Sequence, residues 1–325
     1  MAAKAAPTIY DVYLARKIVY QYLERTPLQY YQSLSEMAGA EIWVKHENHQ
    51  LLGAFKVRGG VYLASLLNEQ EKRAGFFTAS TGNHGQSIAY GAKTFGFRAT
   101  IAVPEDANPA KVSAMCKLGA EVLFHGPNYD AARVWIEQMA KDKGGYYVGP
   151  TDEPLICGVG TYVLEIMEDL PDVDVIIVPV GGGSSAAAAC IVAKTINPNI
   201  EIIGAQSSGA PAAQLSWKSR KPVTANMKTF AEGVATTISF SNTRAILQKH
   251  LDDFLLVDDA DIENAIIIYL QHIHNLAEGA GAIPLATALK YRDRFAGKKV
   301  ALVLSGGNLY MEKLRKIIAK QRSRN

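Results

Sequence analysis

The sequence is poor in cysteine and lacks any long run of apolar residues. Among its 325 residues the cysteines are Cys116, Cys157 and Cys190, and no two of them form a CxxC pair. An odd, widely spaced set of this kind excludes a disulfide scaffold and a structural zinc site. No stretch approaches the ~20 apolar residues that a membrane span needs. We therefore expect buried, reduced thiols and no membrane partner.

The first residues of the chain also lack the pattern of a secretion signal. Residues 1–19 include Lys4, Asp11, Arg16 and Lys17, and these charges interrupt any apolar core that a signal peptide would require. The scarcity of cysteine agrees with a reducing compartment. We therefore expect the protein to be cytoplasmic.

Neither sign of charge dominates the sequence. Lys and Arg number 34 and Asp and Glu number 31, which gives a formal charge of +3. Six of the cations lie in residues 313–325, and removing these six from +3 leaves −3 for the rest of the chain. The chain therefore lacks the basic face of a nucleic-acid-binding protein. Its 48% hydrophobic and 20% charged residues are typical of a globular protein, and its length suits about two domains.

Short apolar segments alternate with helical segments along the chain. The predicted strands, many of them rich in Val and Ile, are Glu41–Lys45, Gly75–Ala79, Arg98–Val103, Glu121–Phe124, Val173–Val180, Glu201–Ala205, Asp253–Val257 and Lys299–Leu304. The predicted helices are Lys56–Leu67, Gly85–Phe95, Ala110–Leu118, Tyr129–Lys143, Thr161–Asp169, Ser185–Asn197, Asp261–Leu276 and Pro284–Phe295. This alternation indicates parallel sheets with right-handed crossovers, and hence an open, doubly wound α/β fold.

Three polar loops follow predicted strands directly. They are Ser80–Asn83, Gly181–Ser184 and Ser305–Asn308. Ligands of parallel α/β sheets gather at the carboxyl ends of the strands, so the agreement of the three loops indicates one ligand site.

Two of these loops suit anions. In "ASTGNHGQ" the free backbone N–H groups of the turn could bind a carboxylate, or Ser80–Asn83 could simply cap the following helix. In "VGGGSS" the three glycines could wrap a phosphate or form only a tight turn. No Lys follows these glycines, so this is not a Walker A motif, and the GxGxxG pattern of nicotinamide-binding enzymes is absent as well.

Lys56 and His84 are ambiguous when they are considered alone. Lys56 starts a predicted helix, where the helix dipole and desolvation would favour an uncharged, nucleophilic amine, although most lysines at such positions are solvated surface groups. Considered alone, His84 is better interpreted as a hydrogen-bonded loop residue than as a base or a ligand.

Taken together, the motifs resemble a known family. In chain order they are "AFKVRGG", "STGNHGQ", "VGGGSS", "FAEGVA", "EGAGA" and "LSGGN". The set is similar to that of the fold-type II pyridoxal-phosphate enzymes, in the threonine/serine dehydratase and serine racemase branch, over about residues 20–310. The resemblance implies two open, twisted, mostly parallel sheets with helices on both faces, like those of the tryptophan synthase β-subunit. It also implies a small domain at 50–148 that binds the substrate carboxylate, a large cofactor-binding domain formed by 1–49 and 149–325, and a homodimer.

The resemblance assigns a role to each matching residue. Lys56 would be joined to pyridoxal 5′-phosphate through an imine and would later act as the base. The residues around the cofactor would be Phe55 beside its ring, Asn83 at its 3′-oxygen, Gly181, Gly182, Gly183 and Ser184 at its phosphate, Gly233 and Glu278 near the ring, and Ser305 at the pyridine nitrogen. The substrate carboxylate would be bound by Ser80, Thr81, Asn83 and the amide of His84.

The implied activity is an α,β-elimination. A β-hydroxy-α-amino acid would be converted to a 2-oxo acid and ammonia by a dehydratase (ammonia-lyase). Because Ser305 is a neutral partner, the cofactor would be a weak electron sink that suits a promptly leaving β-hydroxyl. The alternatives are an amino acid racemase of the serine racemase type and a cofactor-binding protein without turnover.

Four departures from the family pattern bear on the substrate and on metals. Ala54 replaces the usual serine before Phe-Lys, and Val159 stands where glutamine is common, which favours a less polar pocket and a bulkier substrate such as phenylserine. Thr81 occupies the position of the racemase's opposite-face base, where β-branching restricts its rotamers. The family's divalent-cation loop has Gln206 and Ala212 in place of carboxylates, so we expect no metal site.

Overall fold

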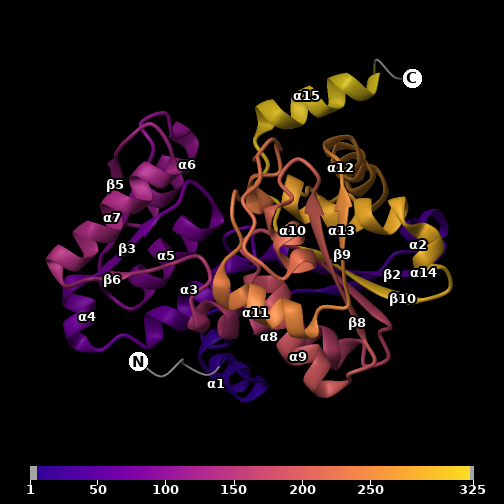
Figure 1. The fold of residues 1–325 in the computed structure, drawn as a ribbon, viewed down its shortest axis with the longest axis horizontal. Helices are drawn as coiled ribbons and strands as arrows, with labels where there is room; N and C mark the ends of the chain where they lie inside the picture. The colour runs from indigo at the N-terminus through magenta and orange to yellow at the C-terminus, as the bar shows by residue number, and fades with distance from the viewer. Residues whose placement is uncertain (1–5, 323–325) are drawn as a thin grey trace. The chain divides into compact units, whose positions relative to one another are not determined.

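The computed structural model describes residues 6–322 and divides into two compact units (Figure 1). Unit 1 consists of residues 6–8, 25–55 and 162–322, and unit 2 of residues 9–24 and 56–161. The sequence-based boundaries were 50 and 148. The structure places the division directly before Lys56, continues unit 2 to Thr161 and adds an N-terminal helix, α1 (Ile9–Val19), to it.

Unit 1 is built on a six-stranded sheet. The strand order is β1 (Leu28–Tyr30), β2 (Glu41–His46), β10 (Lys299–Leu304), β7 (Val175–Pro179), β8 (Glu201–Ser207) and β9 (Asp253–Val257). All neighbours are parallel except β1, which pairs with β2 in the antiparallel direction. The central strands β7 and β10 are almost wholly buried, which explains why their sequences are apolar without alternation.

Helices cover both faces of this sheet. One face carries α2 (Gln32–Ala38), α12 (Asp259–Ile273) and α13 (Gly279–Lys290), whose apolar side chains share one core with the strands. Helix α9 (Ser184–Ile196), which is buried from Ser184 to Ala193, packs on the opposite face, next to α11 (Ser241–His250), as Figure 1 shows. The remaining elements of unit 1 are α10 (Ala212–Ser219), α14 (Arg292–Phe295), α15 (Met311–Arg322) and the short 3-10 helices η1 (Glu47–His49) and η2 (Glu232–Val234).

Unit 2 contains a four-stranded parallel sheet. Its order is β5 (Glu121–Phe124), β4 (Ala99–Val103), β3 (Phe76–Ala79) and β6 (Tyr146–Tyr147). One face packs against α7 (Tyr129–Lys143), and the other against α3 (Lys56–Ser65) and α5 (Asn83–Thr94). The other helices of unit 2 are α4 (Glu69–Ala74) and α6 (Pro109–Lys117), while α8 (Glu153–Asp169) belongs to unit 2 up to Thr161.

Helices α3 and α5 approach each other closely because glycines face the contact. A Cβ atom on Gly60 would lie 2.3 Å from the carbonyl oxygen of Ser87, and one on Gly91 would lie 2.4 Å from that of Gly60. Helix α3 begins with Lys56 and α5 begins with Asn83, so this contact fixes the two helices that carry these predicted site residues.

The predicted α/β fold with two open, mostly parallel sheets is confirmed, and all eight predicted strands are present. The short strands β1 and β6 were not predicted, and neither were α1, α2, α4, α10 and α11. Helix α8 starts at Glu153 instead of Thr161, so the "CGVGT" segment is helical. Within the described residues, no helix has the length and apolar character needed to cross a bilayer.

Candidate functional site

The glycine segment between β7 and α9 forms a cradle of backbone amides. Gly183 has a φ of 92°, which favours glycine, and a Cβ atom on Gly181 would lie 2.3 Å from the carbonyl oxygen of Gly233. Among residues 6–322 the N–H groups of Gly181, Gly182 and Gly183 find no hydrogen-bond acceptor. Buried amides without partners are rare in proteins, so the segment suits an anion better than a simple tight turn.

Ser305 lies beside the segment that leads to Lys56. The N–H of Phe55 donates to the carbonyl of Ser305 at 3.1 Å, and Ala54 forms an antiparallel bridge with Gly306. The next loop residues add two hydrogen bonds, from Gly307 N–H to the Gly53 carbonyl at 2.9 Å and from Asn308 Nδ2 to the Leu52 carbonyl at 2.8 Å. Ser305 is thereby held beside Phe55, the residue that directly precedes Lys56 in the sequence.

The side chains of Phe55 and Ser305 are both buried. The ring of Phe55 contacts that of Tyr162 edge-on at 6.3 Å between centroids, and the Tyr162 hydroxyl lies 2.6 Å from Ser185 Oγ, just after the glycine segment. Ser305 is 2% exposed, and its hydroxyl makes no hydrogen bond to any described residue. It therefore remains available to a ligand nitrogen.

Gly233 and Glu278 complete the group in unit 1. A Cβ atom on Gly306 would lie 2.7 Å from Glu278 Oε1, and one on Gly233 would lie 3.7 Å from the same oxygen. The N–H of Glu278 donates to the Gly306 carbonyl at 3.0 Å. The structure thus brings Phe55, the glycine segment, Gly233, Glu278 and Ser305 together within unit 1.

In unit 2, Ser80 acts as a cap of α5. Its Oγ accepts hydrogen bonds from the N–H groups of Gly82 at 3.2 Å and Gly85 at 3.0 Å. These two amides are thereby occupied, whereas the N–H of His84 has no acceptor within the described part of the chain. The capping interpretation therefore holds for Ser80, and the His84 amide is still free to bind a carboxylate. Thr81 and Asn83 lie half-buried on either side of Gly82.

The imidazole of His84 is uncharged, and its proton can be placed. Thr78 Oγ1 donates its one proton to the Val148 carbonyl at 2.8 Å and lies 3.1 Å from His84 Nε2. Thr78 can therefore only accept from the ring, so Nε2 carries the proton and Nδ1 is left with a lone pair. Burial, followed by the nearby charge of Lys56, lowers the pKa of His84 to about 3. A neutral histidine is thus close to the predicted catalytic amine.

One buried polar atom was not identified from the sequence. The hydroxyl of Thr236 is buried and has no hydrogen-bond partner among the described residues. Thr236 lies three residues after Gly233 in the sequence. A bound molecule near Gly233 would account for the hydrogen bond that this hydroxyl lacks. Nothing in the sequence distinguishes this threonine from an ordinary loop residue.

Gln206, at the expected place of a metal ligand, is engaged in protein contacts. The side chain is fully buried, its Nε2 donates to the Val234 carbonyl at 3.4 Å, and its Oε1 accepts from Gln214 N–H at 3.2 Å. In residues 6–322 no cluster of three or more His, Cys, Asp or Glu side chains could hold a metal ion. The expectation that no metal is bound stays a prediction.

Comparisons with known proteins identify the family. The family model of the pyridoxal-phosphate-dependent enzymes matches residues 19–306. The chain belongs to this family. It is 37% identical to the L-threonine ammonia-lyase of Thermotoga maritima over 96% of this chain and 78% of that protein. It is 34% identical to the serine racemase of Dictyostelium discoideum over 98% of this chain and 100% of that one. The structure of threonine deaminase isoform 2 from Solanum lycopersicum superposes with a TM-score of 0.90, at 29% identity over 98% of this chain and 95% of that chain.

The protein is therefore a fold-type II pyridoxal-phosphate-dependent enzyme of the threonine dehydratase and serine racemase branch. The cradle of unpartnered amides fits the cofactor's phosphate, and the buried, unpartnered Ser305 hydroxyl fits a neutral contact to its ring nitrogen. The predicted cofactor is confirmed at the level of the family, whereas the role of each residue remains a proposal.

Proposed function

We propose that this enzyme is a dehydratase (ammonia-lyase) that converts a β-hydroxy-α-amino acid to a 2-oxo acid and ammonia. The observation that supports this most is that the residue assigned to the pyridine nitrogen is the buried, uncharged Ser305, whose carbonyl accepts the N–H of Phe55. When bound, the cofactor supplies an electron sink for the α-carbon. A serine hydroxyl leaves the pyridine nitrogen unprotonated and the sink weak, which suits a substrate whose β-hydroxyl departs promptly.

In this proposal Lys56 holds the cofactor and then acts as the general base. Its freed amine removes the α-proton of the substrate and keeps that proton as an ammonium group. His84 would be a poor competitor for this proton, because burial lowers the pKa of its ring to about 3. The β-hydroxyl needs a proton to depart as water, and the cofactor's phosphate, which Gly181–Ser184 would hold, could supply it. The enamine that remains would be released and hydrolysed to the 2-oxo acid and ammonia.

Substrate orientation is assigned to the N-terminus of α5. The His84 N–H, which has no acceptor within the described chain, would donate to the substrate carboxylate together with groups of Thr81 and Asn83. Ser80 Oγ already accepts two backbone N–H groups, so its own proton could also be directed to the carboxylate.

The substrate could be threonine or serine, or a bulkier 3-hydroxy amino acid such as phenylserine. Ala54 and Val159 are each 2% exposed and present methyl groups where the family pattern has polar side chains. This difference supports the bulkier substrate, whereas the similarity to threonine ammonia-lyases supports the smaller one. We also propose a cytoplasmic homodimer, which light scattering of the purified enzyme would test.

The second candidate is amino acid racemisation. It is supported by the similarity to a serine racemase and by Thr81, whose hydroxyl could exchange a proton on the opposite face of the substrate. Because Thr81 is β-branched, we expect this activity to be weaker than elimination.

A substrate panel tests the proposal. The holoenzyme is incubated with the L- and D-isomers of serine, threonine and phenylserine, and both 2-oxo acid release and the remaining enantiomer ratio are measured, with Lys56→Ala as the inactive control. We expect 2-oxo acid from at least one member. Inversion without 2-oxo acid would establish the racemase instead, and neither product from fully loaded enzyme would indicate a cofactor-binding protein.

A further inference from the structure

The charge of the cofactor's phosphate is not balanced by the glycine segment itself. Gly181, Gly182 and Gly183 offer neutral amides, and no lysine follows them in the sequence. The N-terminus of α9 contributes only the partial charge of a helix dipole. A phosphate dianion in a largely buried segment calls for a nearby cation as well.

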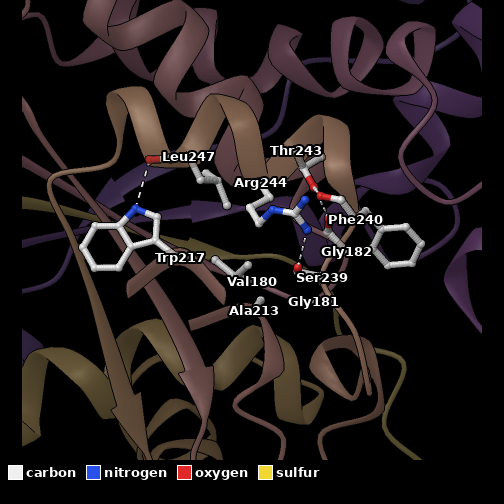
Figure 2. A pocket seen from close by; sticks show the side chains of 11 residues that line it. Val180, Gly181, Gly182, Ala213, Trp217, Ser239, Phe240, Thr243, Arg244 and Leu247 are labelled. Carbon is white, nitrogen blue, oxygen red and sulfur yellow. Dashed lines mark hydrogen bonds between the residues drawn. The ribbon is translucent and has the colours of Figure 1, made fainter. Parts of the chain in front are cut away.

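A small pocket adjoins the glycine segment and contains such a cation. It is lined by Gly181, Gly182 and Gly183 and by side chains of α10 and of the start of α11, including Trp217, Phe240 and Arg244. Arg244 is the one charged side chain in this lining. Figure 2 shows its guanidinium group lying among Thr243, Ser239 and Gly182.

No carboxylate neutralises Arg244. Its Nη1 donates to the uncharged Ser239 Oγ at 2.9 Å, and it forms no ion pair with any described residue. Arg294 of the same unit, by contrast, pairs with both Asp253 and Glu201. Arg244 is also the fourth residue of α11, close to the positive end of that helix, where a cation is disfavoured. Stabilisation of α11 therefore does not explain why an arginine stands at position 244.

The residue before Arg244 is hydrogen-bonded to the glycine segment. Thr243 Oγ1 donates to the Gly182 carbonyl at 2.7 Å, and a Cβ atom on Gly183 would lie 3.1 Å from Thr243 Oγ1. One side of the segment is thus held against α11, which leaves its unpartnered amides for an anion. This contact keeps Arg244 at a fixed place beside the anion cradle.

We propose that Arg244 supplies the positive charge that balances the cofactor's phosphate. This rests on the proposed binding of the phosphate at Gly181–Ser184. The guanidinium stabilises the negative charge of the phosphate by electrostatic attraction, which does not require a direct hydrogen bond between the two groups. At an effective dielectric constant of about 20, removing one such charge from beside the cradle should weaken cofactor binding by about tenfold or more.

The test compares cofactor affinities and does not depend on turnover. Equilibrium dialysis of the holoenzyme gives the dissociation constants of pyridoxal 5′-phosphate and of pyridoxal, which lacks the phosphate, for the native protein, Arg244→Gln and Arg244→Lys. The matched control is Lys249→Gln, which removes one charge from the exposed side of the same helix. Circular dichroism melting confirms that each variant is folded.

We expect Arg244→Gln to lose about tenfold in affinity for the phosphorylated cofactor and none for pyridoxal, in line with the charge argument. Arg244→Lys should retain most of the affinity, and Lys249→Gln all of it. Unchanged affinity of Arg244→Gln for pyridoxal 5′-phosphate would overturn the proposal. So would an equal loss for both compounds, because that would indicate distortion of the site. Since the readout is binding, the substrate panel can fail without affecting this result.

Discussion

Replacing Gly60 by alanine should destabilise the protein and reduce its activity. A Cβ atom at this position would lie 2.3 Å from the Ser87 carbonyl oxygen and 2.7 Å from its carbon. Both are backbone atoms of α5, so α3 and α5 would have to separate by about 1 Å. Overpacking of this kind costs about 1–3 kcal/mol, and the upper end applies because no flexible side chain can yield. Alanine's better helix propensity offsets about 1 kcal/mol. We predict a net loss of about 2 kcal/mol.

Activity should fall for the same reason. Lys56 is the first residue of α3, and α5 carries Asn83 and His84, so a shift between the helices would displace the proposed base from the groups proposed to bind the carboxylate. A displacement of about 1 Å can cost about 100-fold in rate. Thermal and urea unfolding followed by circular dichroism measure the stability, and 2-oxo acid release measures the rate. Ser65→Ala on the same helix is the control and should change stability by less than about 0.5 kcal/mol.

A second glycine of the contact makes the test more specific. Gly91→Ala forces the same separation, because its Cβ atom would lie 2.4 Å from the Gly60 carbonyl oxygen. The double variant should therefore lose less stability than the sum of the single losses. If Gly60→Ala were as stable as the native protein or more stable, and equally active, the proposed role of this close contact would be refuted.

Three further predictions concern the site. His84 binds a proton in the unfolded chain below its ordinary pKa of 6.5 but in the folded protein only near its pKa of about 3, so stability should fall as pH drops below 6.5. Between pH 7 and pH 5, the free energy of unfolding of the native protein should therefore fall by about 2 kcal/mol more than that of His84→Gln, as measured by urea unfolding. An identical fall in both proteins would contradict the buried neutral ring. Dialysis against EDTA should leave 2-oxo acid release unchanged, whereas a loss that Mg²⁺ restores would show that Gln206 does not exclude a metal. Thr81→Ala should reduce any racemisation more than elimination, as measured by chiral chromatography, and an equal reduction would assign Thr81 to substrate binding alone.

Local signals in the sequence predicted some elements to the residue. Helix α7 runs from Tyr129 to Lys143 as expected, because Asn128 caps its start and Gly144 takes the left-handed conformation at its end. The buried strands were found because their apolar residues run without interruption. The three polar loops were correctly predicted to follow strands. They come after β3, β7 and β10, each of which is a parallel strand of its sheet.

Other features depend on packing that a sequence does not reveal. The start of α8 was missed because Gly158 and Gly160 suggest a loop. In the structure these glycines lie within the helix and allow α3 and α1 to approach it closely. A Cβ atom on Gly158 would lie 2.5 Å from the Arg58 carbonyl oxygen, and one on Gly160 would lie 2.8 Å from Val12. Strand β6 has two residues and is defined mainly by its pairing with β3. Arg244 and Thr236 carry no motif, and only the structure shows their unneutralised charge and unpartnered hydroxyl.

The central claim is that Lys56 bears the cofactor, and reductive trapping tests it most directly. The holoenzyme is treated with borohydride, digested and examined by mass spectrometry, with cofactor occupancy measured beforehand by absorbance. We predict a single pyridoxyl group on the peptide that contains Lys56 and no such group in Lys56→Ala. A pyridoxyl group on a different lysine of the native protein, or none on fully loaded enzyme, would contradict the account.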